Sequence, residues 1–217
     1  PKLALGLLVL TLLCSAWRVT RDFALSSDSA ARIVSSEDEL LILVDSNDQN
    51  IGNLSNRDCH DGLGSLHRAF SIFLFNKCGE LLVQQRSSHK RLWPMYWTNS
   101  ICSHPRYGET TELAATRRLD DELHTTSDLE FVYKFEYRAD YGVEGSEHEL
   151  CHVFLGRLNG EPTINKTEIA AIRYLSAEDL EGEFKRHPEV FTPWFKMEWS
   201  RLSTDYSGLL RRYMAAD

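Results

Sequence analysis

Signals for paired cysteines are scarce in this sequence. Its five cysteines are an odd number, and no two of them are spaced as CxxC. Small disulfide-dependent secreted proteins and common zinc modules usually carry such pairs. The pattern therefore favours unpaired thiols in a reducing compartment over a disulfide framework.

Basic charge is scarce as well. The chain has 24 Lys and Arg against 32 Asp and Glu, for a formal net charge of −8. General nucleic-acid binders are normally basic, so we expect no nucleic-acid partner. Local basic residues can still bind a small anionic molecule.

Apolar runs long enough to cross a membrane are also missing, since a span needs about 20 residues. The main run, Leu3–Trp17, has 15 residues and is closer to a signal-peptide core or a short membrane anchor. We expect residues 1–36 to be an apolar, disordered extension and residues 37–217 to form one domain. The cytoplasm is the expected location, with membrane association through residues 3–17 as the alternative. The final Ala-Ala-Asp does not match a peroxisomal tripeptide.

The rest of the chain alternates between strand and helix patterns. Apolar runs flanking the turn at residues 76–79 predict a hairpin. Ala, Leu, Arg and Glu dominate residues 109–123, which predicts a helix whose buried stripe includes Leu113 and Leu119. Ser176 is expected to cap a second helix, and Pro193 to begin a last one that runs to Met214. Further strands are expected at residues 40–44, 131–137, 149–158 and 169–175. The pattern predicts an α+β fold in which helices flank a mixed β-sheet.

Metal-ligand side chains occur in several separate segments. His60 and His67 lie in CHDGLGSLH, His104 lies two residues after a cysteine in TNSICSHP, and Glu147 and Glu149 lie two apart in SEHEL. Residues two apart on a strand point to the same face, so both glutamates can reach one ion. Imidazoles and carboxylates suit a divalent ion such as Zn2+, Mn2+ or Mg2+. Any one of these histidines is more often an ordinary polar residue, but the group indicates an enzyme.

Several segments of the chain carry a combined signal: LLVQQRS, WTNSICSHP, TRRLDDEL, EYRADYGVEGSEHEL and TPWF. In their order and spacing, over roughly residues 40–200, they resemble type I isopentenyl-diphosphate isomerase, a member of the Nudix fold superfamily. The resemblance implies an α/β/α sandwich. It also implies that the chain converts isopentenyl diphosphate to dimethylallyl diphosphate in isoprenoid biosynthesis. A small-molecule substrate and a monomer are the implied partner and assembly.

The resemblance also implies roles for individual residues. Glu149, with Tyr137 beside it, would protonate the alkene, and Cys102 would remove a proton from the other face. The divalent ion would be held by His60, His67, His104, Glu147 and Glu149. Mg2+ would bind with the diphosphate, held by Glu122. The implied substrate-binding residues are Arg57, Arg86, Lys90, Ser103, Arg118 and Trp194.

Three positions depart from the family pattern. Asn56 replaces a usual basic residue, whose role Arg57 is expected to take. Met95 and His124 stand where glycine is usual. Asn56 and Met95, together with the unusual N-terminal segment, leave open a catalytically inactive paralogue that binds isoprenoid diphosphates or a protein partner.

A Nudix hydrolase is the alternative enzyme. Its chemistry needs a cluster of helix carboxylates around Mg2+, but Arg118 stands where the first glutamate of the hydrolase pair belongs. The remaining carboxylates are too few for efficient hydrolysis, whereas an arginine suits the binding of an intact diphosphate.

Overall fold

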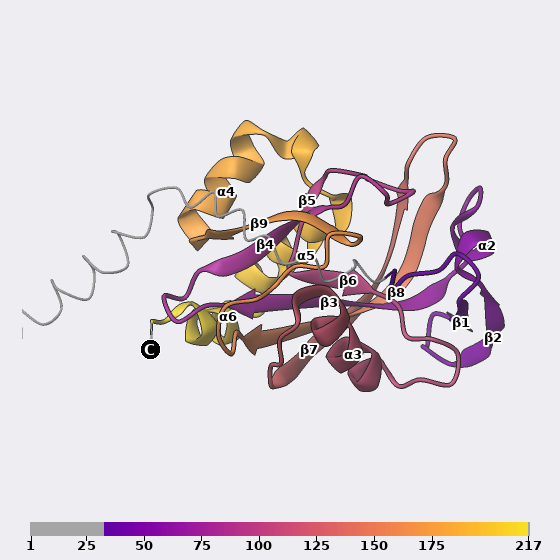
Figure 1. The fold of residues 1–217 in the computed structure, drawn as a ribbon, viewed down its shortest axis with the longest axis horizontal. Helices are drawn as coiled ribbons and strands as arrows, with labels where there is room; N and C mark the ends of the chain where they lie inside the picture. Colours follow the sequence, from indigo (N-terminus) through magenta and orange to yellow (C-terminus); the bar gives the residue numbers. More distant parts are fainter. Residues whose placement is uncertain (1–32, 217) are drawn as a thin grey trace, which may run out of the picture. The chain divides into compact units, whose positions relative to one another are not determined.

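The computed structural model describes residues 33–216 (Figure 1). Its strands are β1 Leu40–Val44, β2 Asn50–Ser55, β3 His67–Phe75, β4 Leu81–Arg86, β5 Trp97–Thr98, β6 Ile101–Ser103, β7 Leu129–Asp140, β8 Ser146–Arg157 and β9 Ile169–Leu175. Its helices are α2 Asn56–His60, α3 Thr111–Leu123, α4 Ala177–Arg186, the 3-10 turn η1 Pro188–Val190, α5 Pro193–Thr204 and α6 Ser207–Met214.

Strand β3 organises a mixed sheet. It pairs antiparallel with β1, β4 and β6, and parallel with β8. The hairpin β7–β8 continues the sheet beyond β3, and β9 pairs with β4. Apart from Ser71, the sequence of β3 from Ala69 to Phe75 is apolar on both faces, as expected for a strand that helices cover on both sides.

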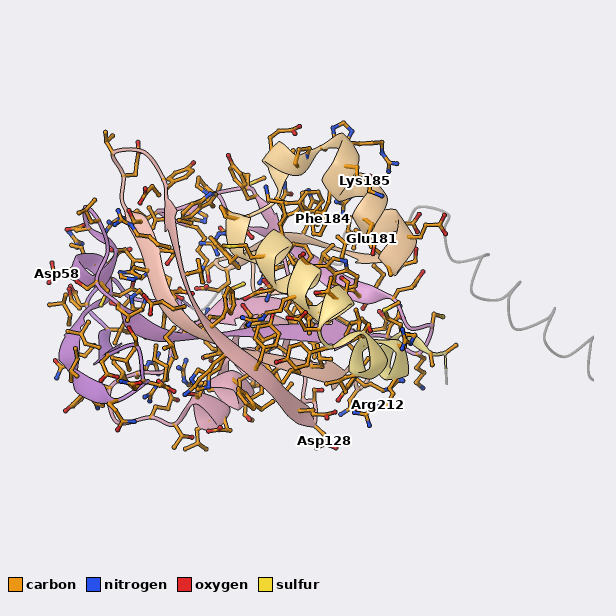
Figure 2. All side chains as sticks on the ribbon, turned by 180° about the vertical axis from the view of Figure 1, so that it is seen from behind. Asp58, Asp128, Glu181, Phe184, Lys185 and Arg212 are labelled. Atoms are coloured by element: carbon orange, nitrogen blue, oxygen red, sulfur yellow. The ribbon has the colours of Figure 1, made fainter. Side chains whose placement is uncertain are left out.

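The two faces of β3 belong to two buried clusters. Phe73 and Phe75 point into the cluster that contains Trp199 of α5, whereas Ile72 and Leu74 join the cluster that contains Leu119 of α3. This alternation is the period-2 pattern of a strand. The view from behind shows α5 and α6 lying across β7 and β8, and α3 lies on the opposite face (Figures 1 and 2). The predicted α+β arrangement is confirmed.

Most predicted elements form at the expected places, but several differ or were not predicted. The predicted last helix is two helices, α5 and α6, and the break lies where Tyr206 stacks on Tyr133 at a ring distance of 4.9 Å. The elements that were not predicted are β2, α2, the short strands β5 and β6, and η1. Leu113 was expected in the buried stripe of α3 but is 63% exposed. The buried face contains Ala114, Ala115, Arg118, Leu119, Glu122 and Leu123.

The predicted domain boundary at residue 36 separates residues that contact each other. Arg118 donates hydrogen bonds to the Val34 carbonyl at 3.2 Å and to Ser35 Oγ at 3.1 Å. Residues 34–36 therefore pack with the domain. The apolar run at residues 3–17 lies outside the described residues. Within residues 33–216, no helix is long and apolar enough to cross a membrane.

Both positions where glycine is usual adopt a left-handed backbone. Met95 has φ 65° and His124, the C-cap of α3, has φ 46°. A residue with a Cβ pays about 1–2 kcal/mol in this region. The conformation explains why glycine suits these sites, and the chain keeps the turn despite the bulk of Met95.

Met95→Gly is therefore expected to stabilise the protein. Relief of left-handed strain exceeds the extra backbone entropy of glycine in the unfolded chain, for a net gain of about 0.5–1 kcal/mol. Urea unfolding would measure this gain. Met95→Ala removes the same side chain but keeps the Cβ, so it should not stabilise the protein; equal gains from both variants would contradict the strain explanation.

Candidate active site

One cavity of about 400 Å³ collects most of the residues singled out in the sequence. Its wall is built from the segment before β1, the end of β4 and the loop after it, residues 167–168 before β9, and parts of α2, β6, α3, β7, β8 and α5. The predicted site residues in its lining are His60, Arg86, Lys90, Cys102, Ser103, His104, Arg118, Tyr137, Glu147, Glu149 and Trp194. His67 and Glu122 lie buried behind the wall, whereas Arg57 is outside it with an exposed side chain.

The predicted metal ligands meet in space. Ligand atoms of His60, His67, His104, Glu147 and Glu149 all lie within 4.8 Å of one another. The parallel pairing of β3 and β8 places His67 beside Glu149, and the alternation of β8 puts Glu147 on the same face. Helix α2 ends at His60, and the three imidazole centroids are 4.8–5.2 Å apart.

Backbone carbonyls orient two of the histidines. His60 Nδ1 lies 2.7 Å from the Asn56 carbonyl, and His67 Nδ1 lies 2.7 Å from the Ser65 carbonyl. A protonated Nδ1 leaves the Nε2 lone pair free to bind an ion, as is usual for metal-ligating histidines. His67 Nε2 is buried without a hydrogen-bond partner among the described residues. This unsatisfied nitrogen, with the mixed histidine and carboxylate donors, fits a divalent ion.

The charges of this cluster are strongly coupled. Burial and the neighbouring Glu147 carboxylate raise the pKa of Glu149 well above its ordinary value. Burial opposes the charged form of His60, but Glu147, 2.8 Å away, outweighs it and raises the pKa of His60 to about 9. Burial lowers the pKa of His104 to about 3. Protons and a metal ion therefore compete for the same donor atoms.

The two predicted proton-transfer groups lie in the same cavity. Tyr137 Oη donates a hydrogen bond of 2.7 Å to Glu149 Oε2, and both side chains are buried. Cys102 Sγ donates to Asn99 Oδ1 at 2.6 Å and accepts from Trp194 Nε1 at 3.1 Å. Removal from water raises the pKa of Cys102 to about 12. The site thus holds a thiol and a carboxyl, both of which favour their protonated forms.

A cationic group lies in another part of the cavity wall. Arg118 is buried and pairs with Glu122 at 2.7 Å and Glu168 at 2.9 Å, and Lys90 pairs with the same Glu168 oxygen. Glu122 and Glu168 hold the guanidinium in its charged form, and the pKa of Arg118 is raised despite burial. The ion pairs with Glu122 and Glu168 therefore fix the positions of Arg118 and Lys90 without a bound anion.

Arg86 is fixed by carbonyl oxygens rather than carboxylates. It donates to the Trp93 carbonyl at 3.1 Å and the Leu92 carbonyl at 2.9 Å, and its guanidinium carbon lies 5.4 Å from the Trp194 ring centroid. These contacts keep it at the cavity, and no carboxylate among residues 33–216 forms an ion pair with it. It is therefore available to an anion.

Three functional candidates were missed by sequence reasoning. Asn99 contacts Cys102, Glu168 holds the cations, and the fully buried Glu198 lies on α5 behind the thiol. A lone Asn or Glu carries no spacing signal, and only the tertiary fold brings these residues to the cavity.

The cysteines follow the sequence prediction only in part. Cys59, Cys102 and Cys151 are free thiols. Cys78 is disulfide-bonded, so the expectation of unpaired thiols is wrong at this position.

Glu198 makes the stability of the protein depend on pH. Burial raises its pKa to about 8, and the ionisable groups facing it are Cys102 on β6, Tyr133 on β7, and Cys151 and Glu149 on β8. The folded state holds this proton more tightly than the unfolded chain. Its contribution is therefore complete below about pH 4.5 and is lost as the pH rises toward 8.

Glu198→Gln should accordingly gain stability over the wild type as the pH rises from 5 to 8, by up to about 4 kcal/mol. Urea unfolding of both proteins at several pH values would measure this difference. If the difference in unfolding free energy between Glu198→Gln and the wild type stayed constant with pH, the Glu198 carboxyl could not be neutral in the folded protein.

Comparisons with known proteins agree with this geometry. The NUDIX domain family model matches residues 65–195. Isopentenyl-diphosphate Delta-isomerase 1 of Photorhabdus laumondii is 43% identical over 164 residues, which cover 75% of this chain and 93% of that protein. An isopentenyl-diphosphate delta-isomerase of Gibberella zeae is 37% identical over 182 residues, covering 74% of this chain and 72% of that protein.

Solved structures show the same fold at low identity. A Deinococcus radiodurans protein has a TM-score of 0.59 at 22% identity and covers 80% of this chain and 98% of its own. The MutT protein of Methanosarcina mazei has a TM-score of 0.53 at 14% identity, covering 65% and 95%.

Proposed function

Because the chain belongs to the isopentenyl-diphosphate Delta-isomerase family and carries a NUDIX domain, we propose that its cavity binds isopentenyl diphosphate between Cys102 and Glu149. The protein is an isomerase that converts isopentenyl diphosphate to dimethylallyl diphosphate. The observation that supports this placement is a single cavity lined by a thiol, a Tyr–Glu pair and a group of fixed cations.

The reaction needs a proton donor and a proton acceptor. A proton added to the terminal alkene carbon gives a tertiary carbocation, and loss of a proton two bonds away moves the double bond. In the proposal, Glu149 and Tyr137 deliver the first proton. Cys102 must first lose its own proton to solvent, and the resulting thiolate receives the second. In the reverse reaction the two groups exchange roles. An alkene is a very weak base, so the donor must act in a pocket shielded from water.

The cavity wall suits a carbocation. Trp194 lines the cavity and directs its indole N–H to the Cys102 sulfur, so its position is fixed. Trp93 packs edge-on against it at 5.1 Å. Aromatic faces attract a cation, and their bulk keeps water away from it.

The diphosphate is assigned to the cationic part of the cavity. Lys90, Arg86 and Arg118 supply charge and hydrogen-bond donors, and Ser103 supplies a hydroxyl. Arg57 is left out of this set because it lies outside the lining. For an incoming diphosphate to bind, it must compete with Glu168 for Lys90 and Arg118.

Two metal roles complete the proposal. The five-residue cluster of His60, His67, His104, Glu147 and Glu149 would hold a divalent ion, whose positive charge would make the Glu149 carboxyl more acidic. Glu122 would hold Mg2+ against the diphosphate, where the ion would neutralise negative charge. We also propose a cytoplasmic monomer that binds no nucleic acid.

Incubation of the purified protein with isopentenyl diphosphate and Mg2+ tests this function. An allylic diphosphate product is expected. Released phosphate would instead indicate a hydrolase, and no turnover would indicate an inactive paralogue.

His67→Ala is expected to weaken binding of a transition metal by more than the roughly 10- to 100-fold that outer-sphere changes cost. The reason is that it removes a buried ligand atom, Nε2, which has no hydrogen-bond partner among the described residues. Elemental analysis after gel filtration would measure the retained ion. His148→Ala changes a half-buried histidine of the same β8 strand and should keep the wild-type content; equal losses in both variants would contradict the assignment.

A further inference from the structure

The carboxyl of Glu198 is buried without a cationic partner. Its residue is 0% exposed, and no Lys, Arg or His among the described residues forms an ion pair with it. Cys151 Sγ lies 3.5 Å from Oε1, Ser71 is within hydrogen-bonding reach, and Oε2 has no partner in the described part of the chain. A buried carboxyl without a counterion favours its neutral form.

Ser71 connects this carboxyl to the catalytic thiol. Ser71 on β3 is the direct strand partner of Cys102 on β6, and its Oγ lies 3.8 Å from the Cys102 sulfur. Its hydroxyl carries one proton. Ser71 can therefore donate to Cys102 or to Glu198, but not to both at once.

We propose that Glu198 is a positioning residue that acts through Ser71 on Cys102. The neutral carboxyl donates its proton to Ser71 Oγ, and the serine then directs its own proton at the Cys102 sulfur. This hydrogen bond stabilises negative charge on the sulfur when Cys102 acts as the base. An ionised Glu198 would instead attract the serine proton and leave the sulfur facing an oxygen lone pair. The inference depends on the proposed role of Cys102.

Two substitutions at Glu198 separate the effect of losing a hydrogen-bond donor from the effect of changing the side-chain volume. Glu198→Gln keeps a neutral N–H donor, so kcat with isopentenyl diphosphate should stay within about threefold of the wild type. Glu198→Leu keeps a similar volume but has no donor, so kcat should fall about 10- to 100-fold with KM unchanged, as expected for loss of a hydrogen bond to a charged group.

Ser71→Ala should cause a loss like that of Glu198→Leu, because it removes the connecting hydroxyl. The double variant Ser71→Ala/Glu198→Leu should have the same kcat as Ser71→Ala alone. Ser100→Ala is the matched control. This buried hydroxyl donates to the Leu82 carbonyl at 2.6 Å and accepts from the Leu74 N–H at 2.8 Å, and it makes no hydrogen bond to Cys102 or Glu198 among the described residues, so its loss should leave kcat unchanged.

The proposal would be overturned if Glu198→Gln and Glu198→Leu lowered kcat equally. It would also be overturned if the loss of kcat in Ser71→Ala/Glu198→Leu were the product of the two single losses. If circular dichroism shows that Glu198→Leu is unfolded, Ser71→Ala is compared with Ser71→Ala/Glu198→Gln, which should have equal kcat; unequal values would overturn it. The wild type is assayed first. Its failure to isomerise the substrate would reject the proposed function itself, whereas an active wild type without this pattern rejects only the role of Glu198.

Discussion

Cys102→Ala is expected to lower kcat by about 10³- to 10⁴-fold while the protein stays folded. The sulfur is the proton acceptor in the proposed reaction, and acid–base groups typically contribute 10²- to 10⁴-fold. The methyl group of alanine can accept no proton, and no other described group takes the thiol's place between Asn99 and Trp194. The product formation rate at saturating substrate measures the loss.

A cysteine elsewhere in the fold provides the control for this variant. Cys59 is also a free, fully buried thiol, but it lies on α2 outside the cavity lining. Cys59→Ala should reduce stability through lost packing and leave kcat near the wild-type value. Retained activity in Cys102→Ala, or an equal loss in Cys59→Ala, would contradict the assigned base.

Glu149→Gln should be at least as damaging as the loss of the thiol. The amide cannot deliver a proton, and it is also a poorer metal ligand than a carboxylate. Tyr137→Phe removes only the hydroxyl that donates to Glu149, so a smaller loss of about 10- to 100-fold in kcat is expected. Steady-state kinetics and metal content, measured on the same samples, separate the two roles of Glu149.

A surface glutamate of the same hairpin provides the comparison for Glu149. Glu136 lies on β7, and its exposed carboxylate contacts His148 at 3.2 Å. Glu136→Gln should change neither kcat nor bound metal. If Glu149→Gln kept full turnover, the carboxyl could not be the acid in this reaction.

Local patterns were sufficient to predict most of the fold. The cap at Ser176, the hairpin around residues 76–79 and strand Ile169–Leu175 each depend on neighbours in the sequence. Strand β2, NIGNLS, was missed because its polar residues and glycine carry no alternation. The break between α5 and α6 was missed because it accompanies a stacking contact between Tyr206 and distant Tyr133.

The candidate site was also predictable only where local sequence patterns carry the information. The spacing in SEHEL and SICSH predicts which side chains share a face, and the resemblance adds their roles. The parallel pairing that places His67 beside Glu149 joins strands that are far apart in the sequence, so no local pattern contains it. The same holds for Glu168 and Glu198, whose importance arises only from the partners that the fold provides.

Solvent deuterium labelling tests most directly whether the acid, Glu149 with Tyr137, and the base, Cys102, are separate groups. The protein is incubated with isopentenyl diphosphate and Mg2+ in D2O, and the product is examined by nuclear magnetic resonance. Because Glu149 and Tyr137 exchange protons with solvent before they react, the newly formed methyl group should carry one deuterium. Transfer of the substrate's own hydrogen to that methyl, without solvent label, would mean that a single group moves the proton, and would contradict separate roles for Cys102 and Glu149.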